Sequence, residues 1–178
     1  MESLFKTVTP DLLSHPYSLV ITCNLIIAIE LLAIMYYVIK VRLQTFTAKF
    51  MKSSGFVETH KDQLGTFPPK LGYPDMGNGR YAKKLPYKEW YRFNCAQRIH
   101  QNFLEAYVLI IVTSLAAGIT YPRATAALQM VFIIGRLVYS MGYMKGGSDK
   151  RLSGAGMAML SQLIILVLSV KSALAIIA

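Results

Sequence analysis

The sequence predicts an all-α protein, an integral membrane four-helix bundle. Composition is the first reason, because 54% of the 178 residues are hydrophobic, too many for an ordinary soluble domain. The second reason is that the apolar residues are gathered into four blocks of about 20 residues, the length an α-helix needs to cross a bilayer. The only long polar stretch, 42–97, is too short and too rich in Gly and Pro for a separate domain. We therefore predict one domain over residues 1–178.

The four spans are predicted at residues 19–41, 98–119, 124–144 and 154–177. Residues 1–18 lack a short apolar core followed by a small-residue cleavage site, so we expect no cleavable signal peptide. The first span is long enough to act as a signal anchor instead. The two cysteines, Cys23 and Cys95, lie in a span and at a loop end, a pattern that predicts neither a disulfide nor a metal site.

Charge asymmetry predicts the orientation of the spans. Residues 40–98 contain twelve Lys or Arg against four Asp or Glu, whereas the connection between the second and third spans carries only Arg123. The positive-inside rule then places the 42–97 loop and the basic turn 145–151 in the cytosol. These segments account for most of the net charge of +10, so contact with anionic lipid headgroups is favoured over binding of nucleic acid.

The cytosolic loop has three parts. Residues 42–52 can continue the first helix beyond the membrane, with the basic side chains reaching toward water. Residues 53–79 contain eight Gly or Pro and are predicted to be irregular. Residues 81–93 contain five aromatic side chains, which favours an interfacial aromatic belt over ligand stacking.

A polar stripe begins the second span. Arg98, Asn102 and Glu105 are spaced i, i+4 and i+7, so on a helix they share one face over two turns. Charged and amide groups in a membrane helix are costly to bury and need a partner. The stripe therefore predicts a polar ligand at this helix.

A second stripe lies on the third span. Arg136, Tyr139 and Tyr143 also share one face, and Gly135 and Gly142 permit close helix approach. If the second and third spans are antiparallel neighbours, both stripes and the basic turn reach the same depth at the cytosolic rim. The sequence thus predicts a cationic, tyrosine-lined pocket there.

Such a pocket suits a small thiol that carries both carboxylates and an amine. Arginine clamps carboxylates, the carboxylate of Glu105 can hold an ammonium group, and Arg or Tyr donors stabilise a thiolate. An apolar co-substrate could arrive from the bilayer. The structural alternative is that Arg136 and Glu105 pair with each other inside the bundle and that the tyrosines only pack.

Three motifs resemble those of the MAPEG family, the membrane-associated proteins in eicosanoid and glutathione metabolism. They are FNCAQRIHQNFLEAY at 93–107, GRLVYSMGY at 135–143, and the basic pair at 150–151. The chain is most similar to type 3 microsomal glutathione S-transferase. This resemblance implies a homotrimer that binds glutathione between protomers and needs no metal. It also implies transfer of glutathione to lipophilic electrophiles, or reduction of lipid hydroperoxides.

The resemblance also implies which residues bind glutathione. By motif position, Arg98, Asn102 and Glu105 match contacts on the second helix. Arg42 occupies the place of a basic residue at the end of the first helix. His100 stands where relatives carry Gln or His.

Catalytic roles follow from the same resemblance. Tyr139 and Tyr143 match glutathione contacts on the third helix, and Arg151 matches the arginine that activates the thiol. The turn before Arg151 is one residue longer than in some relatives, so Lys150 is a rival.

Some features favour an alternative function, a non-catalytic scaffold or an accessory subunit of a larger membrane complex. Ala106 stands where some relatives have an aromatic residue, and the loop 53–92 is longer than in compact members. Glu30 lies in the middle of the first span, where a charge costs about 2.5–3.5 kcal/mol, and Lys171 lies in the fourth. We favour a structural or interface role for Glu30.

The expected location is the endoplasmic reticulum membrane, with the outer mitochondrial membrane as the alternative.

Overall fold

The computed structural model describes residues 16–177, and four long helices dominate this part of the chain. They are α2 (Tyr17–Thr45), α5 (Tyr87–Thr120), α6 (Pro122–Gly146) and α7 (Leu152–Ile177). Each is long and apolar enough to cross a membrane, which confirms the predicted all-α membrane bundle. The tail that we predicted to lack a signal peptide lies, up to residue 15, outside the described residues.

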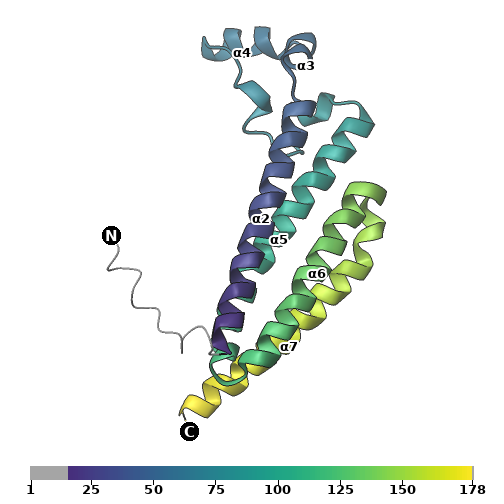
Figure 1. Ribbon diagram of the computed structural model, residues 1–178. Helices are drawn as coiled ribbons and strands as arrows, with labels where there is room; N and C mark the ends of the chain where they lie inside the picture. Colours follow the sequence, from purple (N-terminus) through teal and green to yellow (C-terminus); the bar gives the residue numbers. More distant parts are fainter. Residues whose placement is uncertain (1–15, 178) are drawn as a thin grey trace, which may run out of the picture.

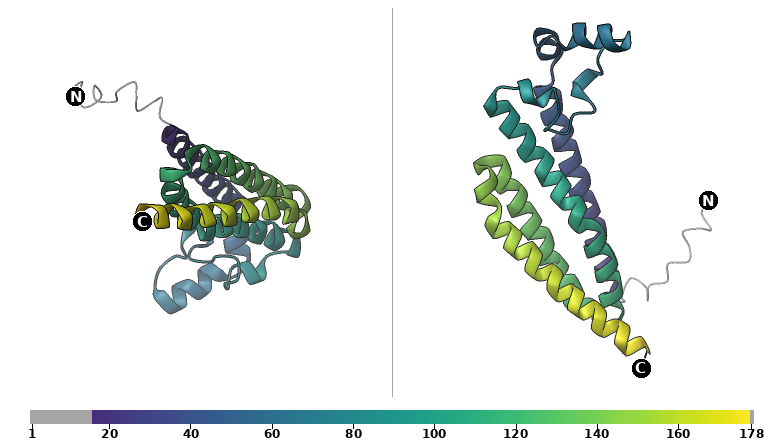
Figure 2. Two further views of the ribbon diagram at one scale, coloured as in Figure 1. Left: turned by 90° about the horizontal axis from the view of Figure 1, so that it is seen from below. Right: turned by 180° about the vertical axis from the view of Figure 1, so that it is seen from behind.

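The four helices form two adjoining pairs (Figure 1). Helix α2 packs on α5 and α6, and α7 packs on α5 and α6, so α5 and α6 are central. The end of the bundle where α2 ends, α5 begins and α6 turns into α7 is called the loop end here. Figures 1 and 2 show that α2 and α5 extend past the α6–α7 hairpin at the loop end and that the two pairs diverge there.

Glycines hold α6 and α7 together. A Cβ atom on Gly154 would lie 2.2 Å from the backbone nitrogen of Tyr139, and one on Gly135 would lie 2.8 Å from that of Ala158. A Cβ atom on Gly142 would meet the carbonyl oxygen of Lys150 at 2.3 Å. The predicted role of Gly135 and Gly142 in close helix approach is therefore confirmed. This contact brings the turn 147–151 against the last turns of α6.

Hydrogen bonds join three helices near the opposite end. The Oδ1 atom of Asn24 on α2 accepts from Ser114 Oγ of α5 at 3.0 Å and from Gln129 Nε2 of α6 at 2.7 Å. All three side chains are buried. Since Asn24 connects α5 and α6 to α2 inside the bundle, these hydrogen bonds constrain the rotation of the helices relative to one another.

The first helix ends earlier than residue 52. Helix α2 ends at Thr45, and a short helix, α3 (Ala48–Ser53), follows after a break at Phe46. The hydroxyl of Thr47 accepts a hydrogen bond from the backbone nitrogen of Phe50 at 3.2 Å and so caps α3. The ring of Phe46 turns inward against Phe93, with the two ring centroids 5.0 Å apart. Burial of this aromatic ring explains why the helix breaks there.

The prediction that residues 53–79 are irregular is wrong in its first half. Helix α4 (Phe56–Leu64) lies within it, flanked by Gly55 and Gly65, both with positive φ. The backbone nitrogen of Gly65 donates to the carbonyl of Lys61 at 2.9 Å. The glycines that we interpreted as loop signals are the boundaries of a helix, where the left-handed conformation favours glycine.

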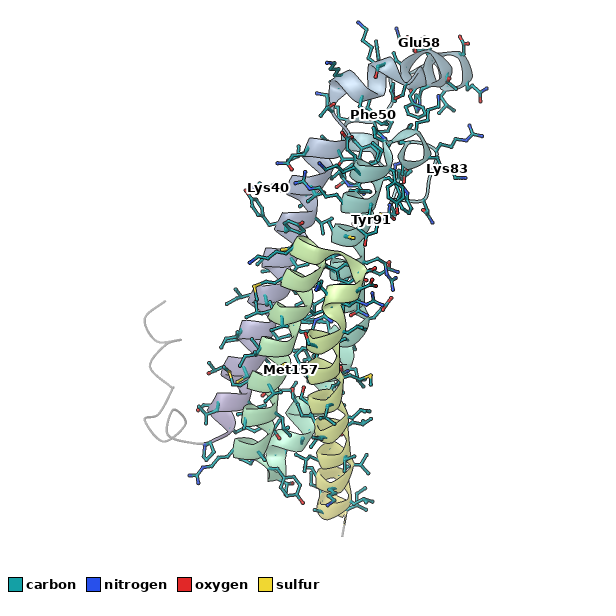
Figure 3. The ribbon with its side chains drawn as sticks, turned by 90° about the vertical axis from the view of Figure 1, so that its right-hand side faces the viewer. Lys40, Phe50, Glu58, Lys83, Tyr91 and Met157 are labelled. Carbon is teal, nitrogen blue, oxygen red and sulfur yellow. The ribbon has the colours of Figure 1, made fainter. Side chains whose placement is uncertain are left out.

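The second long helix begins eleven residues before the predicted span, at Tyr87 rather than residue 98. Its aromatic residues therefore lie on helical turns rather than in a loop. Two short 3-10 helices, η2 (Lys70–Gly72) and η3 (Ala82–Lys84), precede it. We call residues 46–86, which connect α2 to α5 at the loop end, the loop platform (Figure 3).

Arg42 ties the loop platform to the bundle. Its side chain is 3% exposed. The guanidinium donates to the carbonyl oxygens of Leu71 at 3.3 Å and Asp75 at 2.7 Å. It also lies over the rings of Tyr73 and Phe93, at 4.3 and 4.8 Å from their centroids. One buried cation thus holds residues 71–75 against α2 and α5.

The carboxylate of Asp75 organises the next segment. It accepts hydrogen bonds from the backbone nitrogens of Gly77, Gly79 and Ala82 at 2.8, 2.9 and 2.8 Å. A carboxylate that accepts three backbone N–H groups satisfies both of its oxygens internally. The segment from Asp75 to Ala82 is therefore a closed turn around one side chain.

We expect Arg42→Ala to loosen the loop platform while the four long helices stay folded. Loss of the charge-assisted bonds should cost the local closed state about 2 kcal/mol, which corresponds to amide exchange about 30-fold faster. Hydrogen–deuterium exchange of residues 70–82 measures this. Lys40→Ala, at an exposed position on the same helix, is the control. Unchanged exchange in the Arg42 variant would contradict the anchoring role.

Candidate functional site

A buried arginine joins the two polar stripes. Arg136 on α6 is 3% exposed, and its guanidinium lies between the rings of Phe103 and Tyr139, 4.5 Å from each centroid. Its Nη1 atom donates to Asn102 Oδ1 on α5 at 2.8 Å. The two stripes, predicted to reach the same depth, therefore meet through this arginine.

The polar contacts continue along α5. The Nδ2 atom of Asn102 donates to Glu105 Oε2 at 3.4 Å. The structural alternative, a direct pair between Arg136 and Glu105, is not what forms: Arg136 reaches Asn102, and Asn102 reaches Glu105. The carboxylate of Glu105 is exposed and has accepting capacity left for a ligand.

Glu30 faces the same arginine from α2. It is 8% exposed, and neither of its carboxyl oxygens has a hydrogen-bond partner among the described residues. It interacts electrostatically with Arg136. Lys171, the other candidate partner, is exposed on α7. Within the described protomer, Arg136 is therefore the cation that interacts electrostatically with Glu30, although no hydrogen bond or close ion pair joins the two side chains.

The two tyrosines of α6 pack against each other beside the basic turn. The rings of Tyr139 and Tyr143 are edge to face with centroids 5.2 Å apart, and both side chains are buried. The guanidinium of Arg151 lies 5.4 Å from the centroid of Tyr143 and donates to the carbonyl of Ser148. Lys150 is exposed and packs beside Gly146 instead. Of the two rival cations, Arg151 is the one in contact with the tyrosine pair.

A cleft opens beside Tyr143 at the loop end. Its volume is about 380 Å³, and it lies between α2, α5 and the end of α6. The lining residues are Tyr37, Lys88, Tyr91, Arg92, Cys95, Tyr143, Met144, Lys145, Gly146 and Gly147. Three of them are cations and none is acidic, so the cleft favours an anionic ligand.

Sequence reasoning missed several residues of this cleft. Lys88, Arg92 and Cys95 were taken as part of a loop, yet they lie on one face of α5 at i, i+4 and i+7. The same spacing had identified Arg98 and its neighbours, and extending that period backward would have found them. The hydroxyl of Tyr91 also accepts from the backbone nitrogen of Ser148 at 3.0 Å and so joins α5 to the turn.

Other predicted site residues lie elsewhere. Arg98 and Glu105 are on the outer face of α5, exposed in the protomer beside the exposed apolar residues Val108 and Val112. The side chain of His100 is half-buried and forms no hydrogen bond within residues 16–177. Arg42 is buried in its contacts with the loop platform. The structure therefore brings together Asn102, Arg136, Tyr139, Tyr143 and Arg151, and leaves Arg98, His100 and Arg42 apart from them.

Comparison with known protein families shows to which family the chain belongs. The sequence model of the MAPEG family matches residues 20–171, which include all of α5 and α6 and most of α2 and α7. The chain belongs to the MAPEG family. Membership connects this membrane bundle with glutathione and eicosanoid metabolism, a family that includes glutathione transferases and also members without catalytic activity. In this MAPEG protein, the residues of the three motifs lie toward the loop end of the bundle.

We expect the changes in melting temperature caused by substituting Glu30 and Arg136 to be coupled. Arg136→Leu removes the charge that compensates Glu30 and should lower the melting temperature by about 5–10 °C. Glu30→Gln alone should shift it by no more than about 2 °C, because the carboxylate forms no hydrogen bond. The double variant should melt above Arg136→Leu. Thermal unfolding in detergent measures all three, and strictly additive shifts would refute the coupling.

Proposed function

We propose that the protein is a glutathione transferase, with glutathione peroxidase activity, whose site lies at the loop end of the bundle. Glutathione is the thiol substrate, and the second substrate is a lipophilic electrophile or a lipid hydroperoxide from the bilayer. One observation carries this proposal. A continuous series of contacts runs from Glu105 through Asn102, Arg136 and the tyrosine pair to Arg151.

The exposed members of the first stripe hold the two ends of glutathione. Arg98 binds a carboxylate, and Glu105 and Asn102 bind the α-amine. Both Arg98 and Glu105 lie on an outer face of α5 that also exposes Val108 and Val112. A mixed polar and apolar face of this kind suits contact with a second copy. In the proposed homotrimer, glutathione lies between neighbouring protomers.

Arg151 stabilises the sulfur anion. Its guanidinium is already held by the carbonyl of Ser148 and the face of Tyr143, so it need not be reorganised when charge develops on sulfur. The thiol proton leaves to water. With an electrophile, the sulfur forms a bond to carbon while a leaving group such as chloride departs with its electron pair. With a hydroperoxide, the sulfur takes the terminal oxygen as the O–O bond breaks, and the alkoxide leaves as an alcohol with a proton from water. A second glutathione then attacks the sulfenic acid formed, which gives the disulfide and releases water.

The charge asymmetry supports the orientation of this site. The loop end carries the loop platform, with seven Lys or Arg against three Asp or Glu, and the basic turn 145–151, with three against one. With the loop end in the cytosol, water-soluble glutathione reaches the rim directly and apolar substrates arrive between helices. The endoplasmic reticulum membrane is the proposed location, and the outer mitochondrial membrane is the alternative.

A scaffold function is the second candidate. It is favoured by the burial of Arg42, whose guanidinium is committed to the loop platform rather than free for glutathione. A scaffold would tolerate loss of Arg151 without consequence, whereas an enzyme would not.

Arg151→Ala should lower the rate of conjugation about 10²–10³-fold, because it removes the donor that stabilises the thiolate. The matched change Lys150→Ala removes the same charge from the neighbouring residue and should leave most activity. Conjugation of glutathione to 1-chloro-2,4-dinitrobenzene by protein in lipid nanodiscs measures both. Equal activity of the two variants would sink the assignment of Arg151.

Arg98→Gln should raise KM for glutathione about tenfold and leave kcat nearly unchanged, since the lost contact is present in the ground state and the transition state alike. Arg123→Gln, at an exposed position on the opposite end of the bundle, is the control. A loss of kcat without a change in KM would show that Arg98 does not bind the substrate in this way.

A further inference from the structure

A second and larger cleft lies within the loop platform. Its volume is about 820 Å³, within the range of small-molecule sites, and it lies between α4 and residues 74–84. None of its lining residues takes part in the proposed glutathione site. The residues are Phe56, Thr59, His60, Gln63, Leu64, Pro74, Asp75, Met76, Asn78, Gly79, Arg80, Tyr81, Lys83 and Lys84.

The charge of this cleft is positive. Arg80, Lys83 and Lys84 line it, and the one carboxylate among the lining residues is that of Asp75. That carboxylate is turned into its own segment, where three backbone N–H groups donate to it. Its charge is therefore already compensated, and the three cations face the cleft without a carboxylate opposite them.

Two of the cations are free to bind a ligand. The side chains of Arg80 and Lys83 are exposed and form no hydrogen bond or ion pair with any residue of the described chain. Lys84 is engaged, because its Nζ atom donates to the carbonyl of Ser54 at 2.7 Å and lies 4.7 Å from the ring centroid of Phe56. Figure 3 shows Lys83 on the loop platform, beside the loop end of the long helices.

The walls of the cleft are apolar. Phe56 and Tyr81 pack edge to face with centroids 4.7 Å apart, and they form one side. Leu64 and Met76 extend the apolar surface, and they are 66% and 62% exposed. Exposed aliphatic side chains next to free cations are costly to leave in water unless something covers them. A ligand with a hydrocarbon chain and an anionic head would match both features.

We propose that this cleft binds a single-chain lipid anion, with its carboxylate or phosphate monoester at Arg80 and Lys83 and its chain along Leu64 and Met76. The proposal is for binding of the ligand and not for its chemical transformation. This site is separate from glutathione binding. Its failure would leave the proposed function intact, and the reverse also holds.

Trp90 supplies a reporter for this site. It is the only tryptophan in the sequence. Its Nε1 atom donates to the carbonyl of Gly77 at 3.1 Å, between the lining residues Met76 and Asn78. Energy transfer from Trp90 to 11-(dansylamino)undecanoic acid therefore reports binding to the full chain in phosphatidylcholine nanodiscs. The uncharged methyl ester of this probe measures the background from partition into the lipid.

The charge variant Arg80→Gln with Lys83→Gln should weaken saturable binding of the acid about tenfold, to the level of the ester. The matched control, Lys49→Gln with Lys70→Gln, removes two exposed positive charges of the loop platform that do not line the cleft, and it should leave binding unchanged. Thr59→Phe places a ring in the cleft and should abolish the saturable signal. All variants should keep wild-type conjugation of glutathione.

Competition distinguishes the two head groups. Displacement of the probe by oleate at lower concentration than by lysophosphatidate identifies a fatty acid site, and the reverse order identifies a phosphate site. The proposal is overturned if the acid and the ester give the same energy transfer, or if the charge variant and its matched control lose binding equally. It is also overturned if Thr59→Phe leaves the saturable signal in place.

Discussion

The buried guanidinium of Arg136 is the interaction on which the rest of the site depends. A cation inside a membrane helix must be compensated, and this one takes its partners from three helices: Asn102 on α5, Tyr139 on its own helix, and the charge of Glu30 on α2. Satisfying it fixes how α6 faces α5. That orientation in turn places Tyr143 beneath Arg151 and leaves Glu105 at the surface. The packing of the helices and the arrangement of the proposed site at the loop end therefore depend on the same guanidinium.

A second buried arginine, Arg42, has a similar role between the bundle and the loop platform. Arg42 gathers the carbonyls of Leu71 and Asp75 and two aromatic rings, and so attaches a long polar segment to the ends of α2 and α5. The sequence shows the cation but does not indicate its partners, because the two carbonyls lie some thirty residues further along the chain. Because of this attachment, the loop platform is an ordered layer above the bundle and carries a cleft of its own.

Periodicity predicted the membrane helices and both polar stripes, because apolar blocks of spanning length and i, i+4, i+7 spacing are local signals. The same signals could not show that Asn102 lies between Arg136 and Glu105, since that depends on the rotation of two helices. Gly55 and Gly65 were misleading because glycine marks helix ends and loops alike. Lys88 and Arg92 were missed for a different reason: α5 begins in a segment whose polarity resembles that of a loop. Arg42 matched a family position, yet its burial follows from contacts that no motif encodes.

Glutathione binding at the loop end is the central claim, and calorimetric titration of the purified protein in nanodiscs tests it most directly. The protein should bind glutathione saturably, with heat that is lost when Arg98 and Glu105 are both replaced by uncharged residues. Ophthalmic acid, which has a methyl group where glutathione has its thiol, should still bind through the same carboxylates and amine, but more weakly. The absence of saturable heat at millimolar glutathione, with the bundle folded, would contradict the claim and favour the scaffold.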